Sequence, residues 1–183
     1  MNRYKHVLAI ALTGLALIGK GQDVIYPYPK DSSIIQMKSY YRGFGKVFYK
    51  EEDVKKDFFG NAYPKPFSPT YQADFELGEN DIVKAEKLLL NKYFSARIDG
   101  HTKNDFNKAK KQLKSYYRQY FGYISKNNEI IIYIKLLNFR KKKSANKYFS
   151  KWDQVFFSGF GRYYEQNAES YIINLTTENV SLL

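Results

Sequence analysis

The chain has 183 residues and a formal net charge of +12, from 30 Lys and Arg against 18 Asp and Glu. It contains no cysteine, which excludes disulfides, cysteine nucleophiles and cysteine metal sites. The positive charge favours anionic partners, such as acidic glycans, lipids or nucleic acid, without selecting among them, and many exported proteins are simply basic.

Residues 1–21 have the anatomy of a secretory signal peptide. A basic start with Arg3 and Lys5 is followed by an apolar run over 7–18 and by small residues that suit cleavage before Gln22. The run is shorter than the roughly 20 residues that a membrane-spanning helix needs. We therefore expect an exported product, periplasmic or secreted, with no transmembrane segment. Loss of the three cations of the signal would lower its charge from +12 to +9.

Residues 22–79 are rich in Tyr, Pro, Phe and Lys and are predicted to form an aromatic N-terminal arm before one domain at 80–183. The arm could wrap that domain or be partly mobile, and its aromatic content argues against full disorder. Its expected elements are an extended segment at 26–29, short strands over 34–41 and 46–49, and a helical turn over 51–59.

Residues 80–97 carry the clearest pattern in the chain, an amphipathic helix with Asn80 as a possible N-cap. At about 100° per residue, Ile82, Leu89 and Tyr93 share one apolar direction, while lysines occupy the opposite side. Glu86 is the exception, because it falls near the middle of the apolar face, where a carboxylate needs a partner.

The rest of the chain predicts an antiparallel sheet. Residues 99–114 could be a short helix or a loop. The spacing gives no βαβ signal, so a parallel nucleotide-binding sheet is not expected. The fold class is therefore α+β, with one long helix on a curved antiparallel sheet of about four strands. The expected strands are 116–124, 129–139, 152–158 and 171–176, with a brief helix over 144–151.

Several motifs resemble those of small uncharacterised exported bacterial proteins with a cystatin-like or NTF2-like domain. They are DIVKAE at 81–86, YRQYFGYI at 117–124, Trp152 and YIINL at 171–175, so the resemblance covers roughly 80–176. It implies a long helix lying in the curve of an antiparallel sheet. The motifs carry no known chemistry, so the resemblance implies a fold and not an activity.

The first candidate site is the pair Glu86 and Arg118, with Tyr93, Tyr116 and Tyr120 around it. If Arg118 points toward the helix, Tyr116 and Tyr120 share its side of the strand. An arginine and a glutamate on apolar faces are each costly unless they pair, which favours a buried ion pair. The alternative is that both line an open pocket and hold a polar ligand.

The second candidate site is the basic tract Arg140, Lys141, Lys142 and Lys143, with Lys147 and Lys151 nearby. It could contact phosphate or sulfate groups, and neighbouring aromatic side chains could stack on bases or sugars. The alternative is a solvated turn between strands. Tyr163 and Tyr164 beside Arg162 admit the same two interpretations.

Catalysis has little support in the sequence. After cleavage His101 would be the only histidine, and no serine lies in a nucleophile elbow. A mechanism with two carboxylates, such as Asp74 and Glu76, stays open. We therefore expect a non-catalytic binding or interaction module without cofactor or metal, whose partner is an anionic polymer or another exported protein. A small enzyme with a pocket between helix and sheet, and a basic surface protein that binds anionic glycan, lipid or nucleic acid, are the alternatives.

Overall fold

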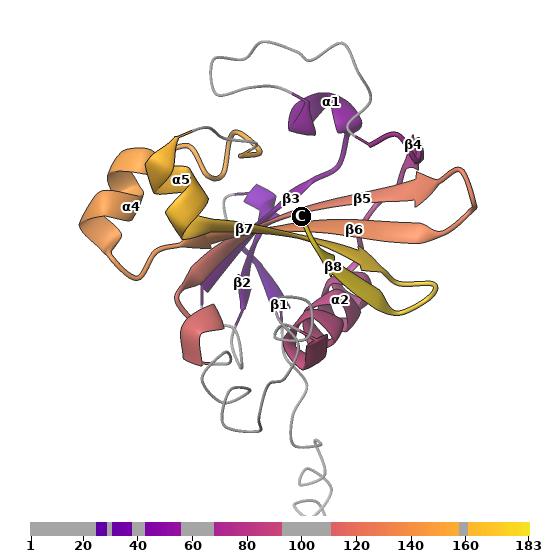
Figure 1. Cartoon of the computed structure of the whole chain (residues 1–183), viewed down its shortest axis with the longest axis horizontal. Helices are drawn as coiled ribbons and strands as arrows, with labels where there is room; N and C mark the ends of the chain where they lie inside the picture. Colours follow the sequence, from indigo (N-terminus) through magenta and orange to yellow (C-terminus); the bar gives the residue numbers. More distant parts are fainter. Residues whose placement is uncertain (1–24, 29–30, 38–42, 56–67, 93–110, 158–160) are drawn as a thin grey trace, which may run out of the picture.

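A computed structural model describes residues 25–28, 31–37, 43–55, 68–92, 111–157 and 161–183, with side chains from Phe44 onward (Figure 1). The predicted signal peptide and its cleavage site lie outside these residues, as do Tyr93 and His101.

The described chain forms one eight-stranded mixed sheet in the order β1-β2-β3-β5-β6-β7-β8, with β4 paired to β5 beside this path. β3 and β5 run parallel, with Gly45 opposite Arg118, and the other neighbours are antiparallel. The strands are β1 (Ile25–Tyr28), β2 (Asp31–Met37), β3 (Gly43–Phe48), β4 (Tyr71–Asp74), β5 (Tyr116–Ser125), β6 (Ile130–Asn138), β7 (Ala168–Asn174) and β8 (Asn179–Leu182). The helices whose bounds lie within the described residues are α1 (Glu51–Val54), α2 (Glu79–Lys92), α4 (Lys142–Tyr148) and α5 (Arg162–Asn167), and residues 111–113 are helical too.

The predicted fold, a curved antiparallel sheet of about four strands with an N-terminal arm, is wrong. The segment assigned to the arm supplies β1 to β4 of the same sheet. The pairing of β3 with β5 is parallel and joins segments about 70 residues apart, with α2 in the connection between them. A parallel pair needs such a crossover, and local sequence patterns do not report which distant strands will pair. The α+β composition itself is what the structure shows.

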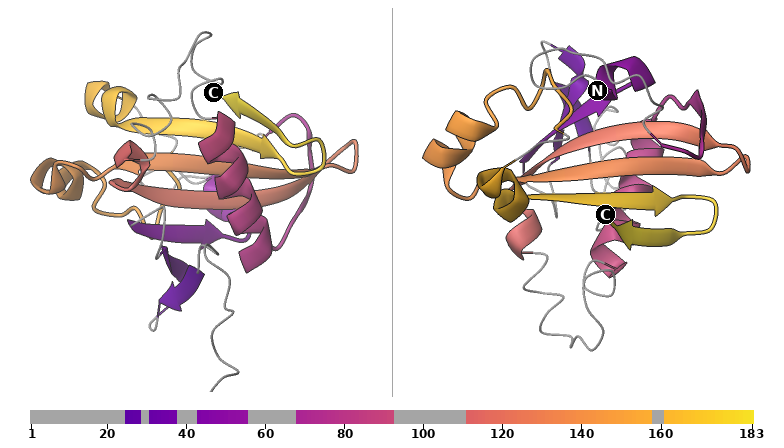
Figure 2. Two further views of the ribbon diagram at one scale, coloured as in Figure 1. Left: turned by 90° about the horizontal axis from the view of Figure 1, so that it is seen from below. Right: turned by 45° about the horizontal axis from the view of Figure 1, so that its top comes forward.

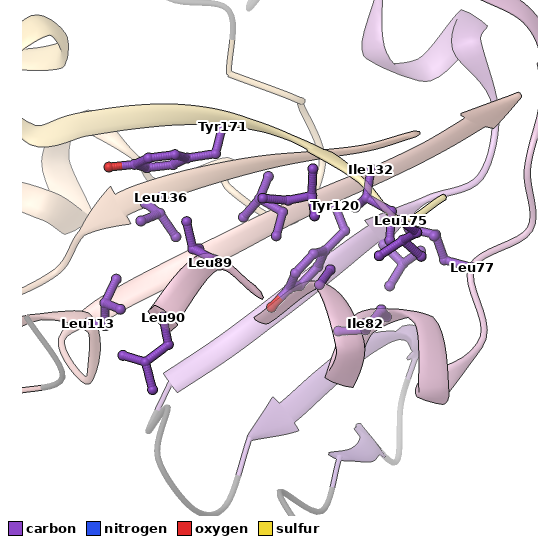
Figure 3. Packing of buried hydrophobic residues seen from close by; sticks show 14 residues of the cluster. Leu77, Ile82, Leu89, Leu90, Leu113, Tyr120, Ile132, Leu136, Tyr171 and Leu175 are labelled. Carbon is purple, nitrogen blue, oxygen red and sulfur yellow. The ribbon is translucent and has the colours of Figure 1, made fainter. Parts of the chain in front are cut away.

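α2 lies across one face of the sheet, as Figure 2 shows, and its apolar stripe packs there. Ile82, Ala85 and Leu89 are almost fully buried against strand residues such as Tyr120 and Ile132 (Figure 3). The predicted helix is confirmed over the described residues, but Asn80 is not its cap. The Asp81 carboxylate instead accepts a hydrogen bond from the Gly78 N–H at 3.0 Å, beside the first turn.

The opposite face of the sheet is covered by α1, α4, α5 and residues 149–157, which follow α4. Figures 1 and 2 place α4 and α5 together at one end of the long strands, away from the β5–β6 turn. We call residues 139–157 and 161–167 the α4–α5 lobe. Its aromatic core is buried on the sheet and includes Phe139, Phe149 and Phe157. The protein therefore has three layers, with the α2 layer and the α4–α5 lobe on opposite sides of one sheet.

Two local predictions in this half of the chain have different outcomes. The β5–β6 hairpin is confirmed, and its turn places Asn128 at φ 59°, a conformation that Asn tolerates well. The strand predicted over 152–158 is wrong, because residues 151–154 form a turn and Val155 lies in a bend. The carbonyls of Trp152 and Val155 there accept hydrogen bonds from the Gln119 side chain, which takes the place of a strand partner.

Candidate functional site

Glu86 of α2 and Arg118 of β5 meet between the helix and the sheet. The Arg118 Nε donates to Glu86 Oε1 at 3.0 Å, and the two side chains are 0% and 1% exposed. The Tyr120 hydroxyl donates to the same carboxylate oxygen at 2.7 Å. The structure therefore brings together three of the five residues predicted for this site in one buried polar cluster.

Main-chain carbonyls complete the surroundings of the guanidinium. Nη2 of Arg118 donates to the carbonyl of Leu113 at 3.0 Å, and Nη1 donates to the carbonyl of Tyr116. Arg118 thus ties α2, its own strand and the segment just before that strand. Because a guanidinium has five donors in a planar fork, one arginine can satisfy several acceptors at such a junction.

The other members of the predicted site do not join this cluster through their side chains. The Tyr116 hydroxyl is directed to Glu169, 3.4 Å away, and Tyr93 lies outside the described residues. The pair itself has almost no contact with solvent. A ligand could reach the pair only if the packing between α2 and the sheet opened. The arrangement therefore suits a buried structural ion pair and not an accessible pocket.

The basic tract lies on the surface of the α4–α5 lobe. Arg140, Lys141, Lys142 and Lys143 are all exposed, and they form the approach to α4 and its first turn rather than a plain loop between strands. Lys147, Lys151 and Arg162 of the same lobe are exposed too. The acidic residues of the described lobe are Asp153 and Glu165, against these seven cations.

An aromatic pair accompanies these charges. Tyr148 at the end of α4 stacks on Tyr163 of α5, with ring centroids 4.1 Å apart and an angle of 18° between the planes. The Lys147 ammonium lies 5.3 Å from the centre of the Tyr148 ring. Burial, with a smaller effect from Tyr148, raises the pKa of Tyr163. Phe139, by contrast, is buried and stacks on Tyr117 at 3.9 Å, so it is not available for stacking on a ligand.

The lobe is attached to the sheet by polar side chains of β5 and β6. Gln119 donates to the carbonyls of Trp152 and Val155, at 2.6 and 2.7 Å, and accepts from the Phe157 N–H at 2.8 Å. On the neighbouring strand, Lys135 donates to the Tyr164 hydroxyl, which donates in turn to the carbonyl of Phe157. These contacts hold the surface that carries the basic tract in a fixed position on the sheet.

Lys135 is a buried cation that the sequence analysis did not single out. It is 4% exposed, and its ammonium lies 5.2 to 6.0 Å from the ring centres of Tyr133, Phe156 and Tyr164. Burial lowers its pKa from 10.5 to about 8. The signal was present in the sequence, since a lysine in the apolar run IIIYIKLL breaks the pattern just as Glu86 breaks that of α2.

Comparison with known proteins adds no assignment. Neither a family model, nor a curated protein, nor a solved structure matches the chain. The resemblance to small exported bacterial proteins therefore stays a prediction. No helix among the described residues has the length and apolarity that crossing a membrane requires. In the same residues no group of three or more His, Cys, Asp or Glu is arranged to hold a metal ion.

Breaking the buried pair on one side is expected to destabilise the protein strongly. Arg118→Met or Glu86→Leu leaves one buried charge without its main partner, which costs about 3 to 5 kcal/mol of the free energy of unfolding. The double variant removes both charges and should lose much less than the sum of the single losses. Urea unfolding of the four proteins measures this, and strictly additive losses would contradict the ion pair.

Lys135 predicts a defined pH dependence of stability. Its pKa is about 8 in the folded protein and 10.5 in the unfolded chain, so the unfolded chain binds more protons between these values. The contribution of Lys135 to the free energy of unfolding therefore rises from pH 8 to pH 10.5, by roughly 3 kcal/mol at most. The measurement is the difference in unfolding free energy between wild type and Lys135→Met at several pH values, which cancels the titration of other groups.

The exposed Lys87 provides a matched control for this experiment. The difference between wild type and Lys87→Met should stay flat over the same range. A flat difference for Lys135→Met as well would contradict the lowered pKa.

Proposed function

We propose that the protein is an exported, non-catalytic binding module that contacts an anionic polymer through the α4–α5 lobe. The observation that carries the proposal is the charge of this lobe: seven exposed Lys and Arg against Asp153 and Glu165. Clustered cations raise the local concentration of anionic partners and speed their association. Export rests on the signal-peptide pattern of residues 1–21.

The placement of Lys142 and Lys143 does not serve the stability of α4, whereas Lys147 lies in its last turn, where a cation suits the helix dipole. Lys142 and Lys143 occupy its first turn, which has no acidic residue, and they oppose the helix dipole there. Lys143 and Lys147 are four residues apart on the same helix, where like charges repel by a few tenths of a kcal/mol, about 0.2 to 0.5. A bound anion would relieve both effects. Unfavourable local charge of this kind supports a binding role for the tract.

The small-enzyme alternative is weaker in light of the geometry of the first site. It relied on an accessible Glu86 or Arg118 in a pocket between helix and sheet. Both side chains are buried and bonded to the protein, so they are poorly placed to meet a substrate. The two interpretations of the basic tract, a ligand surface and a solvated turn, are separated by experiment.

The test is the salt dependence of binding to a labelled uronic acid polymer, polygalacturonate. Wild-type affinity should fall by about tenfold or more between roughly 50 and 200 mM salt, because bound cations release counterions from the polymer. Replacing Arg140, Lys141, Lys142 and Lys143 together by Gln should remove most of this binding. The thermal midpoint of this variant should stay at or above that of wild type, since the lost charges opposed the helix dipole.

A matched control removes the same amount of charge elsewhere. Lys50, Lys87, Lys111 and Lys114 are exposed and lie outside the lobe. Replacing these four by Gln should reduce binding far less than neutralising the tract. Equal loss in the two variants would show attraction by net charge alone and would contradict a binding surface on the lobe.

A further inference from the structure

We infer that the polymer is an acidic polysaccharide and that its sugar rings pack on Tyr148, an inference that rests on the proposed function and deepens it. Tyr148 is 47% exposed, more than any other aromatic side chain in the described part of the chain. An exposed tyrosine alone needs no explanation. Its position among cations, and the support beneath it, are what point to a ligand.

The Tyr148 ring is supported from below. One of its faces stacks on Tyr163, and Tyr163 packs in turn on Phe149, which is 1% exposed, with ring centroids 5.5 Å apart. Rings from α4 and α5 therefore build a small aromatic platform on the aromatic core of the lobe. A platform held from two elements loses little conformational freedom when a flat ligand packs on it.

Cations accompany this platform. The Lys147 ammonium lies over the Tyr148 ring, 5.3 Å from its centre, and Lys143 lies one helical turn earlier. The six-residue step from Lys142 to Tyr148 spans about 9 Å of helix. A ligand that follows α4 would meet cations first and then the exposed Tyr148 ring with the Lys147 ammonium over it.

This combination fits a polymer that carries both rings and anionic groups. The face of an aromatic ring is negative and attracts the weakly positive C–H bonds on the flat side of a pyranose. Ammonium groups pair with the carboxylate or sulfate substituents of the same sugars. A ring-free polyanion could use the cations but would gain nothing from Tyr148. Because the signal-peptide pattern predicts export, we favour an acidic polysaccharide over nucleic acid, which is the competing class for such a surface.

The test compares two polyanions on the full chain. Wild type is titrated with polygalacturonate, which has rings, and with polyphosphate, which has none. Tyr148→Leu keeps an apolar side chain but removes the ring, and we expect it to weaken polygalacturonate binding by roughly two- to tenfold. Its polyphosphate binding should stay within about twofold, and Tyr148→Phe should bind both polymers like wild type.

Controls address folding and position. Thermal unfolding of each variant checks the fold, and Tyr49→Leu changes another exposed tyrosine, 38% accessible, outside the lobe. Tyr49→Leu should bind polygalacturonate like wild type. An equal loss in Tyr49→Leu and Tyr148→Leu would overturn the assignment to Tyr148.

The remaining outcomes separate this inference from the proposed function. If wild type binds both polymers and Tyr148→Leu affects neither, or affects both equally, the sugar inference fails while the anion-binding function stands. If wild type binds an oligothymidine more tightly than polygalacturonate and depends on Tyr148 as strongly, the partner is a nucleic acid and the inference is overturned. If wild type shows no salt-sensitive binding to either polyanion, both proposals fail.

Discussion

The ion pair between Glu86 and Arg118 is the constraint on which the arrangement of helix and sheet depends. A single guanidinium contacts the α2 carboxylate and the carbonyls of Leu113 and Tyr116, while the Tyr120 hydroxyl donates to the same carboxylate oxygen. Each of these buried polar groups would cost free energy without its partners. They therefore restrict how α2 can sit on β5, where purely apolar packing would tolerate several positions. This helix-covered side of the sheet is closed, and its polar groups serve the architecture.

The other side of the sheet is built differently, and its surface is where we place function. Gln119 and Lys135 lie on adjacent strands and bind the turn after α4 and the Tyr164 hydroxyl of α5. They hold a lobe whose interior is aromatic and whose exterior is strongly basic. The two sides of one sheet thus use polar residues in the same way, to fix a covering layer. They differ in what the covering layer presents to solvent: α2 presents a mixture of charges, and the lobe presents mostly cations.

Local patterns predicted the elements that depend on local interactions. The periodicity of α2 and the turn residues of the β5–β6 hairpin each act over a few residues, and both elements form as predicted. Glu86 and Arg118 were also predictable as partners, because each interrupts an otherwise apolar or aromatic face.

The parallel β3–β5 pair was not predictable, since Gly45 and Arg118 meet only through the tertiary fold. The aromatic segment 152–158 has strand-type residues, but the Gln119 side-chain amide donates hydrogen bonds to the carbonyls of Trp152 and Val155. Local sequence rules do not predict such a long-range contact. Of the surface that we propose as functional, the basic tract was evident from sequence, whereas the Tyr148–Tyr163 stack joins two helices and requires the structure.

The central claim is that ligand contact occurs on the α4–α5 lobe and not at the buried pair. The most direct measurement is a residue-by-residue map of backbone amide NMR shifts while polygalacturonate is added to the protein. The account predicts that the largest changes fall within residues 139–157 and 161–167 and leave α2 and residues 113–120 nearly unchanged. Changes centred on α2 and on residues 113–120 would contradict it, because they would show that the ligand reaches the junction of Glu86 and Arg118.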